Sequence, residues 1–186
     1  GYAQETKTYS YTFEKKVFDS SNQSQKLNGI SWTLSTDGNY WNYDETKGQQ
    51  FGSGSSPANK LSLVTDEFTG KITSIKINTS GASKIKGTLV VSVGNTEYGS
   101  YTLTSTATSK EFIGESEGEI KLSYSQTSSK AIYIKSIEIT YSEKTKSLTS
   151  LAISGTPTKT TYNVGDTFDP AGLKVTGTYD DNSTAT

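Results

Sequence analysis

The chain lacks the side chains on which many enzymes depend. Its 186 residues contain no cysteine, histidine or methionine, and all 18 positive charges are lysines because arginine is also absent. Without histidine and cysteine there is no imidazole base, thiolate nucleophile or thiolate metal ligand. Without arginine there is no guanidinium fork for a phosphate or carboxylate. Carboxylates, amides, hydroxyls, lysines and aromatic rings remain, and they favour a protein that binds over one that catalyses.

Strong charge of either sign and long apolar runs are missing as well. The net charge is −1, and no run holds more than two adjacent lysines. A nucleic-acid or membrane-surface partner calls for a concentrated basic face, so we expect neither partner. No stretch of 18 apolar residues occurs, so we expect no membrane insertion of this chain.

Apolar residues are few, at 31% of the chain, but they alternate with polar ones as in half-buried strands. Serine and threonine together supply 57 residues, which fill many of the positions between them. A β-sandwich needs apolar side chains only at alternate positions, so this composition still makes a core. We therefore predict an all-β fold of nine or ten strands before residue 143, with a hairpin turn at 93–96. The alternation is clearest at residues 9–13, 30–34, 61–63, 75–77, 89–93, 101–103, 120–124, 132–134 and 137–141.

One short pattern recurs in three segments, residues 72–77, 134–139 and 148–153. In each segment apolar residues stand at positions i, i+3 and i+5, with serine at i+2. One extra residue therefore interrupts strict alternation, and a β-bulge at the serine would restore the inward face after it. We interpret the pattern as three strands that contain the same kind of bulge rather than as a duplication.

A change in composition predicts two modules, residues 6–142 and 147–186, joined by a polar, charged linker at 143–146. Segments 148–153, 158–162, 164–169, 172–175 and 179–181 resemble the bacterial immunoglobulin-like repeats of surface proteins. The resemblance implies the N-terminal part of an immunoglobulin-like β-sandwich. Since the family's remaining strands do not follow and the chain does not begin with methionine, we expect a piece of a longer, processed surface protein.

The first module carries four further segments of interest, residues 32–44, 47–52, 75–81 and 130–137. They resemble jelly-roll modules of gut-bacterial surface and secreted proteins, which are similar to galactose-binding-like and carbohydrate-binding folds. The resemblance implies a jelly-roll β-sandwich and an extracellular setting, but no reaction.

Candidate ligand-binding side chains cluster between residues 37 and 44. Sugars present C–H faces that stack on aromatic rings, and hydroxyls that bond to amides and carboxylates. In an extended run Trp41 and Tyr43 share one face, while Tyr40, Asn42 and Asp44 share the other. The run predicts either a glycan platform or a strand whose Trp41 and Tyr43 pack inward, in which case the other three still face outward. The candidates are Asp37, Asn39, Tyr40, Trp41, Asn42, Tyr43 and Asp44.

Two other clusters of oxygen ligands are weaker. Asp37, Asn39 and Asp44 carry the atoms that calcium prefers, but their spacing fits no calcium loop, and an Asp-Gly-Asn sequence is ordinary turn chemistry. The carboxylates at 115, 117 and 119 have similar neighbours, whereas a glycosidase pair needs two different environments. We expect no metal, no cofactor and no catalytic residues.

These observations favour a non-catalytic extracellular binding module of a bacterial cell-surface protein, with carbohydrate or a cell-surface glycan as its partner. Two alternatives stay open. The chain is a structural or adhesive spacer whose aromatic residues form core, or it is an accessory domain of a larger secreted enzyme. Glycan binding by the intact module separates the first hypothesis from the spacer.

Overall fold

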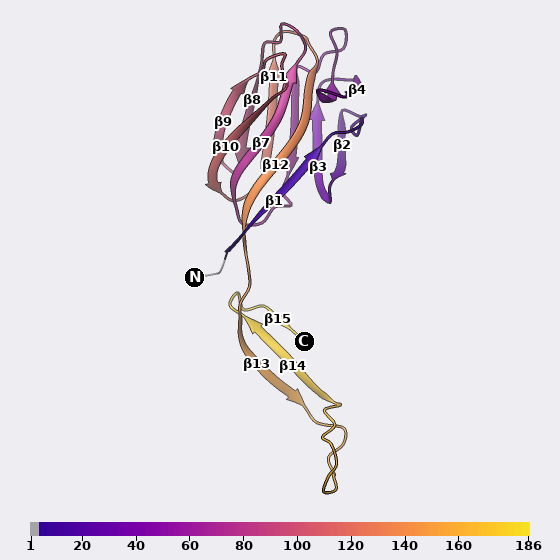
Figure 1. Cartoon of the computed structure of the whole chain (residues 1–186), viewed down its shortest axis with the longest axis vertical. Helices are drawn as coiled ribbons and strands as arrows, with labels where there is room; N and C mark the ends of the chain where they lie inside the picture. Colours follow the sequence, from indigo (N-terminus) through magenta and orange to yellow (C-terminus); the bar gives the residue numbers. More distant parts are fainter. Residues whose placement is uncertain (1–3) are drawn as a thin grey trace. The chain divides into compact units, whose positions relative to one another are not determined.

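A computed structural model describes residues 4–186 and contains strands but no helix in that range (Figure 1). The predicted all-β class is confirmed. The chain divides into two compact units, a sandwich formed by residues 6–143 and a unit that holds residues 144–186. Within residues 4–186 no helix has the length and hydropathy that a membrane span needs.

Two antiparallel sheets form the sandwich. Sheet A has the strand order β10-β7-β12-β5-β4, and β1 also pairs with β12. Its strands are β1 (Gln4–Thr12), β4 (Trp41–Asp44), β5 (Gly48–Phe51), β7 (Lys71–Gly81), β10 (Thr108–Ser116) and β12 (Ile132–Lys144). Sheet B has the order β2-β3-β6-β11-β8-β9. Its strands are β2 (Asn22–Leu27), β3 (Ile30–Thr36), β6 (Lys60–Thr65), β8 (Gly87–Val93), β9 (Thr96–Thr102) and β11 (Ile120–Gln126).

The connections are those of a jelly-roll sandwich. Consecutive strands from β1 to β12 lie in opposite sheets, except in the hairpins β2–β3, β4–β5 and β8–β9. Repeated passage between two packed antiparallel sheets is typical of Greek-key and jelly-roll folds. The predicted hairpin at 93–96 is present, because Val93 pairs with Thr96 and Gly94 has φ 56°.

The core lies between the sheets and is built from the inward side chain of every second residue. Trp32 and Leu34 of β3 are fully buried there, as are Ile75 and Ile77 of β7. The Trp32 indole donates a hydrogen bond of 3.2 Å to the Tyr9 hydroxyl, whose own proton goes to the Leu27 carbonyl at 2.6 Å. The polar tips of these large rings are therefore satisfied inside an apolar layer.

The recurring apolar pattern forms a bulge in each of its three segments. The register skips one residue at Thr73 opposite β12, at Lys135 opposite β7, and at Thr149 in the second unit. The three predicted bulges are confirmed, but the extra residue precedes the serine instead of being the serine. Each bulge returns the next apolar side chain to the face of the first.

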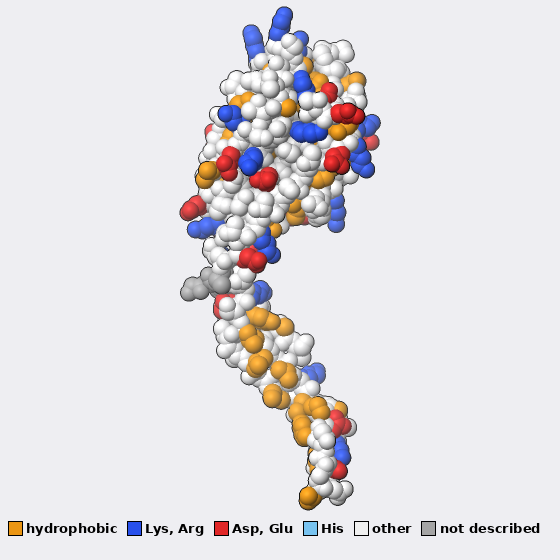
Figure 2. Space-filling view, viewed as in Figure 1, with side chains coloured by type: hydrophobic (Ala, Val, Ile, Leu, Met, Phe, Trp, Pro, Cys, Tyr) orange, Lys and Arg blue, Asp and Glu red, His pale blue; other side chains and the backbone are white. Residues whose placement is uncertain are grey.

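The second unit contains the three-stranded tail sheet, β13 (Leu148–Gly155), β14 (Leu173–Tyr179) and β15 (Thr184–Ala185). Its apolar side chains alternate as in the sandwich, but one face stays open. Leu151 is 64% exposed and Ile153 is 70% exposed. Figure 2 shows these apolar side chains gathered along the sheet.

Candidate functional site

The run from Asp37 to Asp44 leaves sheet B and enters sheet A, so its residues do not form one surface. Asp37 follows β3 and closes a turn, where its carboxylate accepts the Lys60 backbone N–H at 2.9 Å. Gly38 packs directly on Ala58, and an added Cβ would lie 2.8 Å from the Ala58 Cβ. Asn39 is exposed between the two strands. The Asp-Gly-Asn segment therefore serves as the turn that carries the chain from one sheet to the other.

Trp41 and Tyr43 lie on the inner face of β4, at the edge of sheet A. They are paired in register with Phe51 and Gln49, which are both fully buried. Trp41 is half-buried and meets the Phe51 ring edge to face, at 6.2 Å between centroids. The ammonium of Lys135 lies 5.9 Å from the centroid of the Tyr43 ring. These two aromatic side chains thus border the core rather than form an open platform.

Tyr40, Asn42 and Asp44 lie on the opposite, outer face. Tyr40 is 39% exposed, and its hydroxyl oxygen accepts a long hydrogen bond of 3.5 Å from the Asn42 amide. The Asp44 carboxylate accepts the backbone N–H groups of Thr46 and Lys47, each at 2.8 Å. These bonds close the β4–β5 turn, and the second Asp44 oxygen forms no hydrogen bond with any residue of 4–186.

A second tyrosine joins this outer face from β12. Asn42 pairs with Gln50 across β4 and β5, and Gln50 pairs with Tyr133, so the three side chains form one row. The Lys47 ammonium lies 5.1 Å from the centroid of the Tyr133 ring. Burial raises the pKa of Tyr133, and the nearby Asp44 and Tyr40 raise it further. We call this surface the aromatic patch; its residues are Tyr40, Asn42, Asp44, Lys47, Gln50 and Tyr133.

Tyr133 did not figure among the candidates drawn from the sequence, although a signal for it was present. It stands between Ile132 and Ile134, which are both fully buried, so alternation puts it on the outer face. Its place in the same row as Asn42 depends on strand order in sheet A, which puts β5 and its Gln50 between β4 and β12.

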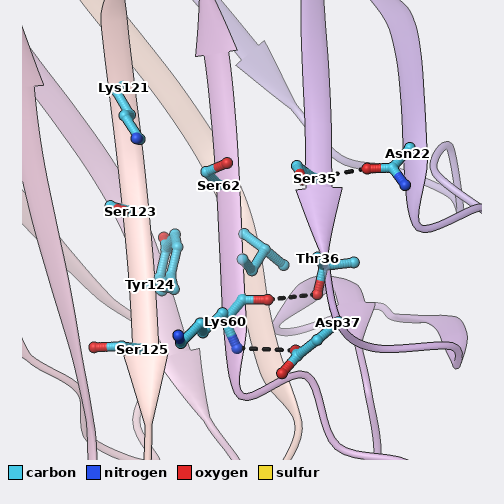
Figure 3. Close-up of a pocket in the computed structure, with 11 residues that line it drawn as sticks. Asn22, Ser35, Thr36, Asp37, Lys60, Ser62, Lys121, Ser123, Tyr124 and Ser125 are labelled. Atoms are coloured by element: carbon cyan, nitrogen blue, oxygen red, sulfur yellow. Dashed lines mark hydrogen bonds between the residues drawn. The ribbon is translucent and has the colours of Figure 1, made fainter.

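A shallow groove of about 540 Å³ lies on the outer face of sheet B (Figure 3). Its floor is one register row across four strands, formed by Asn22, Ser35, Ser62 and Ser123. Lys60 and Lys121 border the row, and Asp37 stands at the end of β3. We call this surface the serine groove. Asp37 is the one sequence candidate that lines it.

Neither surface has the pattern of a hydrolase or a metal centre. Glu115, Glu117 and Glu119 are all exposed to solvent. Among residues 4–186 no three acidic side chains are grouped so as to hold a metal ion. The arrangement of both surfaces provides rings, amides, hydroxyls and ammonium groups, which are means of holding a ligand.

Comparison with protein-family models finds a similarity in the second unit. The sequence model of the bacterial Ig-like domain (group 3) matches residues 155–185. A search of curated protein sequences finds no match.

Several solved structures are similar in fold to this chain. One is a variant of a family 29 carbohydrate-binding module, at 12% identity and a TM-score of 0.44, covering 75% of this chain and 93% of that one. Another is a family 29 carbohydrate-binding module from Piromyces equi, at 13% identity and a TM-score of 0.41, covering 73% of this chain and 91% of that one. A third is a family two carbohydrate esterase from Cellvibrio japonicus, at 13% identity and a TM-score of 0.40, covering 75% of this chain but 34% of the esterase. Likeness at this level does not identify a ligand or a reaction for this chain.

Proposed function

We propose that the sandwich is a non-catalytic glycan-binding module of an extracellular bacterial surface protein, and that the glycan binds at the aromatic patch. The observation that carries the proposal is the placement of Tyr40 and Tyr133 on one outer face, with an amide row between β4 and β12. Aromatic rings offer a stacking surface, and neighbouring amides fix the orientation of a bound ring through its hydroxyls.

Each polar group of the patch has a distinct use toward a sugar. The Asn42 amide and the free Asp44 oxygen project from β4, where they reach the hydroxyls of a ring stacked on Tyr40. Gln50 is half-buried, and its amide donates to the Gly52 carbonyl at 2.9 Å, while its side-chain oxygen forms no hydrogen bond within residues 4–186 and can accept one from a ligand. Lys47 covers part of Tyr133, so a ligand on that ring displaces the ammonium or bonds to it.

The proposed setting rests on the second unit. A match to a bacterial Ig-like domain over residues 155–185 supports a module carried by a surface protein, with adhesion to a glycan as its role. No step of chemistry is required of the sandwich in this role, which agrees with a chain that has no histidine, cysteine or arginine.

A glycan array probed with the intact chain, followed by titration calorimetry of each hit, tests the proposal. Tyr40→Ala should weaken binding about tenfold, because an aromatic contact contributes about 0.5–1.5 kcal/mol beyond the area it buries. Combining Tyr40→Ala with Tyr133→Ala should weaken binding further, to the detection limit.

Tyr101→Ala is the matched control, since Tyr101 is a half-buried tyrosine of β9 in the other sheet. It should leave affinity unchanged, and circular dichroism should show that all three variants are folded. The proposal fails if the intact chain binds no glycan, which is the outcome expected of a spacer. It fails equally if the double variant binds as well as the parent.

A further inference from the structure

The serine groove differs in chemistry from the aromatic patch. Its floor carries no aromatic side chain, because the inward-facing Tyr124 reaches the groove only from beneath and donates its hydroxyl proton to Thr79 in the core at 3.0 Å. Stacking, the usual means of holding a neutral sugar, is therefore not available there. What the groove does offer is a row of hydroxyls between two ammonium groups.

The two lysines hold their charge free for a ligand. Among residues 4–186 neither Lys60 nor Lys121 forms an ion pair. The Asp37 carboxylate, the nearest acid of the groove, bonds to the backbone N–H of Lys60 and not to its ammonium. Figure 3 shows the Lys121 side chain extending along β11 toward Ser123, and the Lys60 side chain reaching from β6 toward Ser125.

The register fixes how these charges stand around the floor. Lys60 is paired with Ser125, and Ser62 with Ser123, so Lys60 and Lys121 lie on opposite sides of the Ser62–Ser123 row. Ser125 lies four positions after Lys121 along β11, a backbone distance of roughly 14 Å. Within the described chain the hydroxyls of Ser62, Ser123 and Ser125 have no hydrogen-bond partner. A sugar ring on this row meets hydroxyl donors beneath it and an ammonium on either side.

We propose that the serine groove binds an acidic polysaccharide, one whose sugar units carry carboxylates. An ammonium paired with a carboxylate gives a charge-assisted hydrogen bond, which is stronger than a neutral one. The neighbouring hollow of the same sheet, about 410 Å³, is lined by Asp66, Glu67 and Glu119. These acids repel a dense polyanion such as nucleic acid or a heavily sulfated chain, whereas a polymer with one carboxylate per sugar can direct its charges to Lys60 and Lys121 on either side of the serine row.

Titration calorimetry with the intact chain tests this inference. The probes are oligogalacturonate, oligoalginate and oligoglucuronate, together with methyl-esterified oligogalacturonate as a neutral partner of the same backbone. At least one acidic probe should bind, and esterification should weaken binding about tenfold. The variant Lys60→Gln with Lys121→Gln should cause a similar loss.

The control variant, Lys71→Gln with Lys110→Gln, removes the same charge from sheet A and should bind like the parent. Binding should also persist in Tyr40→Ala with Tyr133→Ala, which separates the groove from the aromatic patch. The inference is overturned if none of the three acidic probes binds or if the ester binds equally well. Equal losses in the two lysine variants, or tighter binding of heparin or DNA, would also overturn it.

Discussion

The sandwich and the tail sheet are built on the same alternation of apolar and polar residues, but only the sandwich covers its apolar side. In the sandwich, Leu34 and Leu63 are fully buried, while in the tail sheet Leu151 and Ile153 are 64% and 70% exposed. Alternation decides which face of a strand a side chain takes. Burial requires a second layer, which the sandwich supplies with its other sheet. The same pattern therefore contributes more to the stability of the sandwich than to that of the tail sheet.

The difference bears on where binding surfaces are held firmly. Tyr133 of the aromatic patch, and Ser62 and Ser123 of the serine groove, each project from a strand between two neighbours that are buried in the packed core. Rigid support of this kind keeps a binding surface in one geometry, whereas thinly packed segments open locally at low cost. We therefore place both proposed sites on the sandwich.

The largest expected effect comes from replacing a leucine by alanine in the sandwich, which we compare with the same replacement in the tail sheet. Leu34→Ala should lower the free energy of unfolding of the sandwich by about 3–5 kcal/mol, because it leaves a cavity. Leu151→Ala should change the stability of the tail sheet by less than about 0.5 kcal/mol, because its side chain is exposed. Native-state hydrogen exchange read by mass spectrometry measures both units in one sample. A cost of several kcal/mol for Leu151→Ala would break the comparison, since it would require a cover on the tail sheet in solution.

Much of the sandwich could be predicted from the sequence because its central strands alternate strictly. Ile30, Trp32 and Leu34 were expected to share one face, and the last two are fully buried. The pattern misses the short inner strand β5, which has only four residues, and the two polar edge strands β2 and β10. In β2 only Leu27 is buried, and in β10 only Phe112, so neither strand shows apolar alternation. The position of each bulge was wrong by one residue, because spacing shows that a residue is extra but not which one leaves the ladder.

The candidate site was harder to predict, because it depends on contacts between distant segments. The sequence groups Tyr40 and Trp41 as neighbours, yet alternation sends them to opposite faces of sheet A. Tyr133 is 93 positions from Tyr40 and joins it only through the order of β4, β5 and β12. The serine groove has little local signal, since its serines come from three strands, β3, β6 and β11, and look like ordinary surface residues.

A buried amide should give the second largest effect. Gln49 is fully buried, and its side-chain oxygen accepts the backbone N–H groups of Val17 and Phe18 at 2.7 and 3.1 Å. Gln49→Leu should lower the free energy of unfolding by about 2–3 kcal/mol, because buried donors lose their acceptor. The control is Gln50→Leu, whose amide faces outward with one bond to Gly52, and it should cost less than about 1 kcal/mol. Urea unfolding followed by tryptophan fluorescence reports on the sandwich alone, since Trp32 and Trp41 both lie there. Equal losses of stability in the two variants would show that Gln49 does not hold the segment between β1 and β2 that contains Val17 and Phe18.

The smallest effect sharpens the contrast through pH. Burial raises the pKa of Tyr9 to about 12, against the weaker opposing influence of the Trp32 indole. Between the ordinary tyrosine pKa of 10.0 and this value the unfolded chain binds fewer protons than the folded one. The contribution of Tyr9 to the free energy of unfolding is therefore complete below pH 10 and is lost as the pH rises toward 12, by about 2 kcal/mol from pH 9 to 11.5.

Lysine deprotonation also changes the stability in this pH range, so the measurement is the difference between the parent and Tyr9→Phe in urea unfolding at each pH. The variant should start less stable, having lost its bond to the Leu27 carbonyl, and should show a flatter decline. Parallel declines would mean that the Tyr9 hydroxyl reaches solvent, and the sandwich would then resemble the tail sheet at this edge.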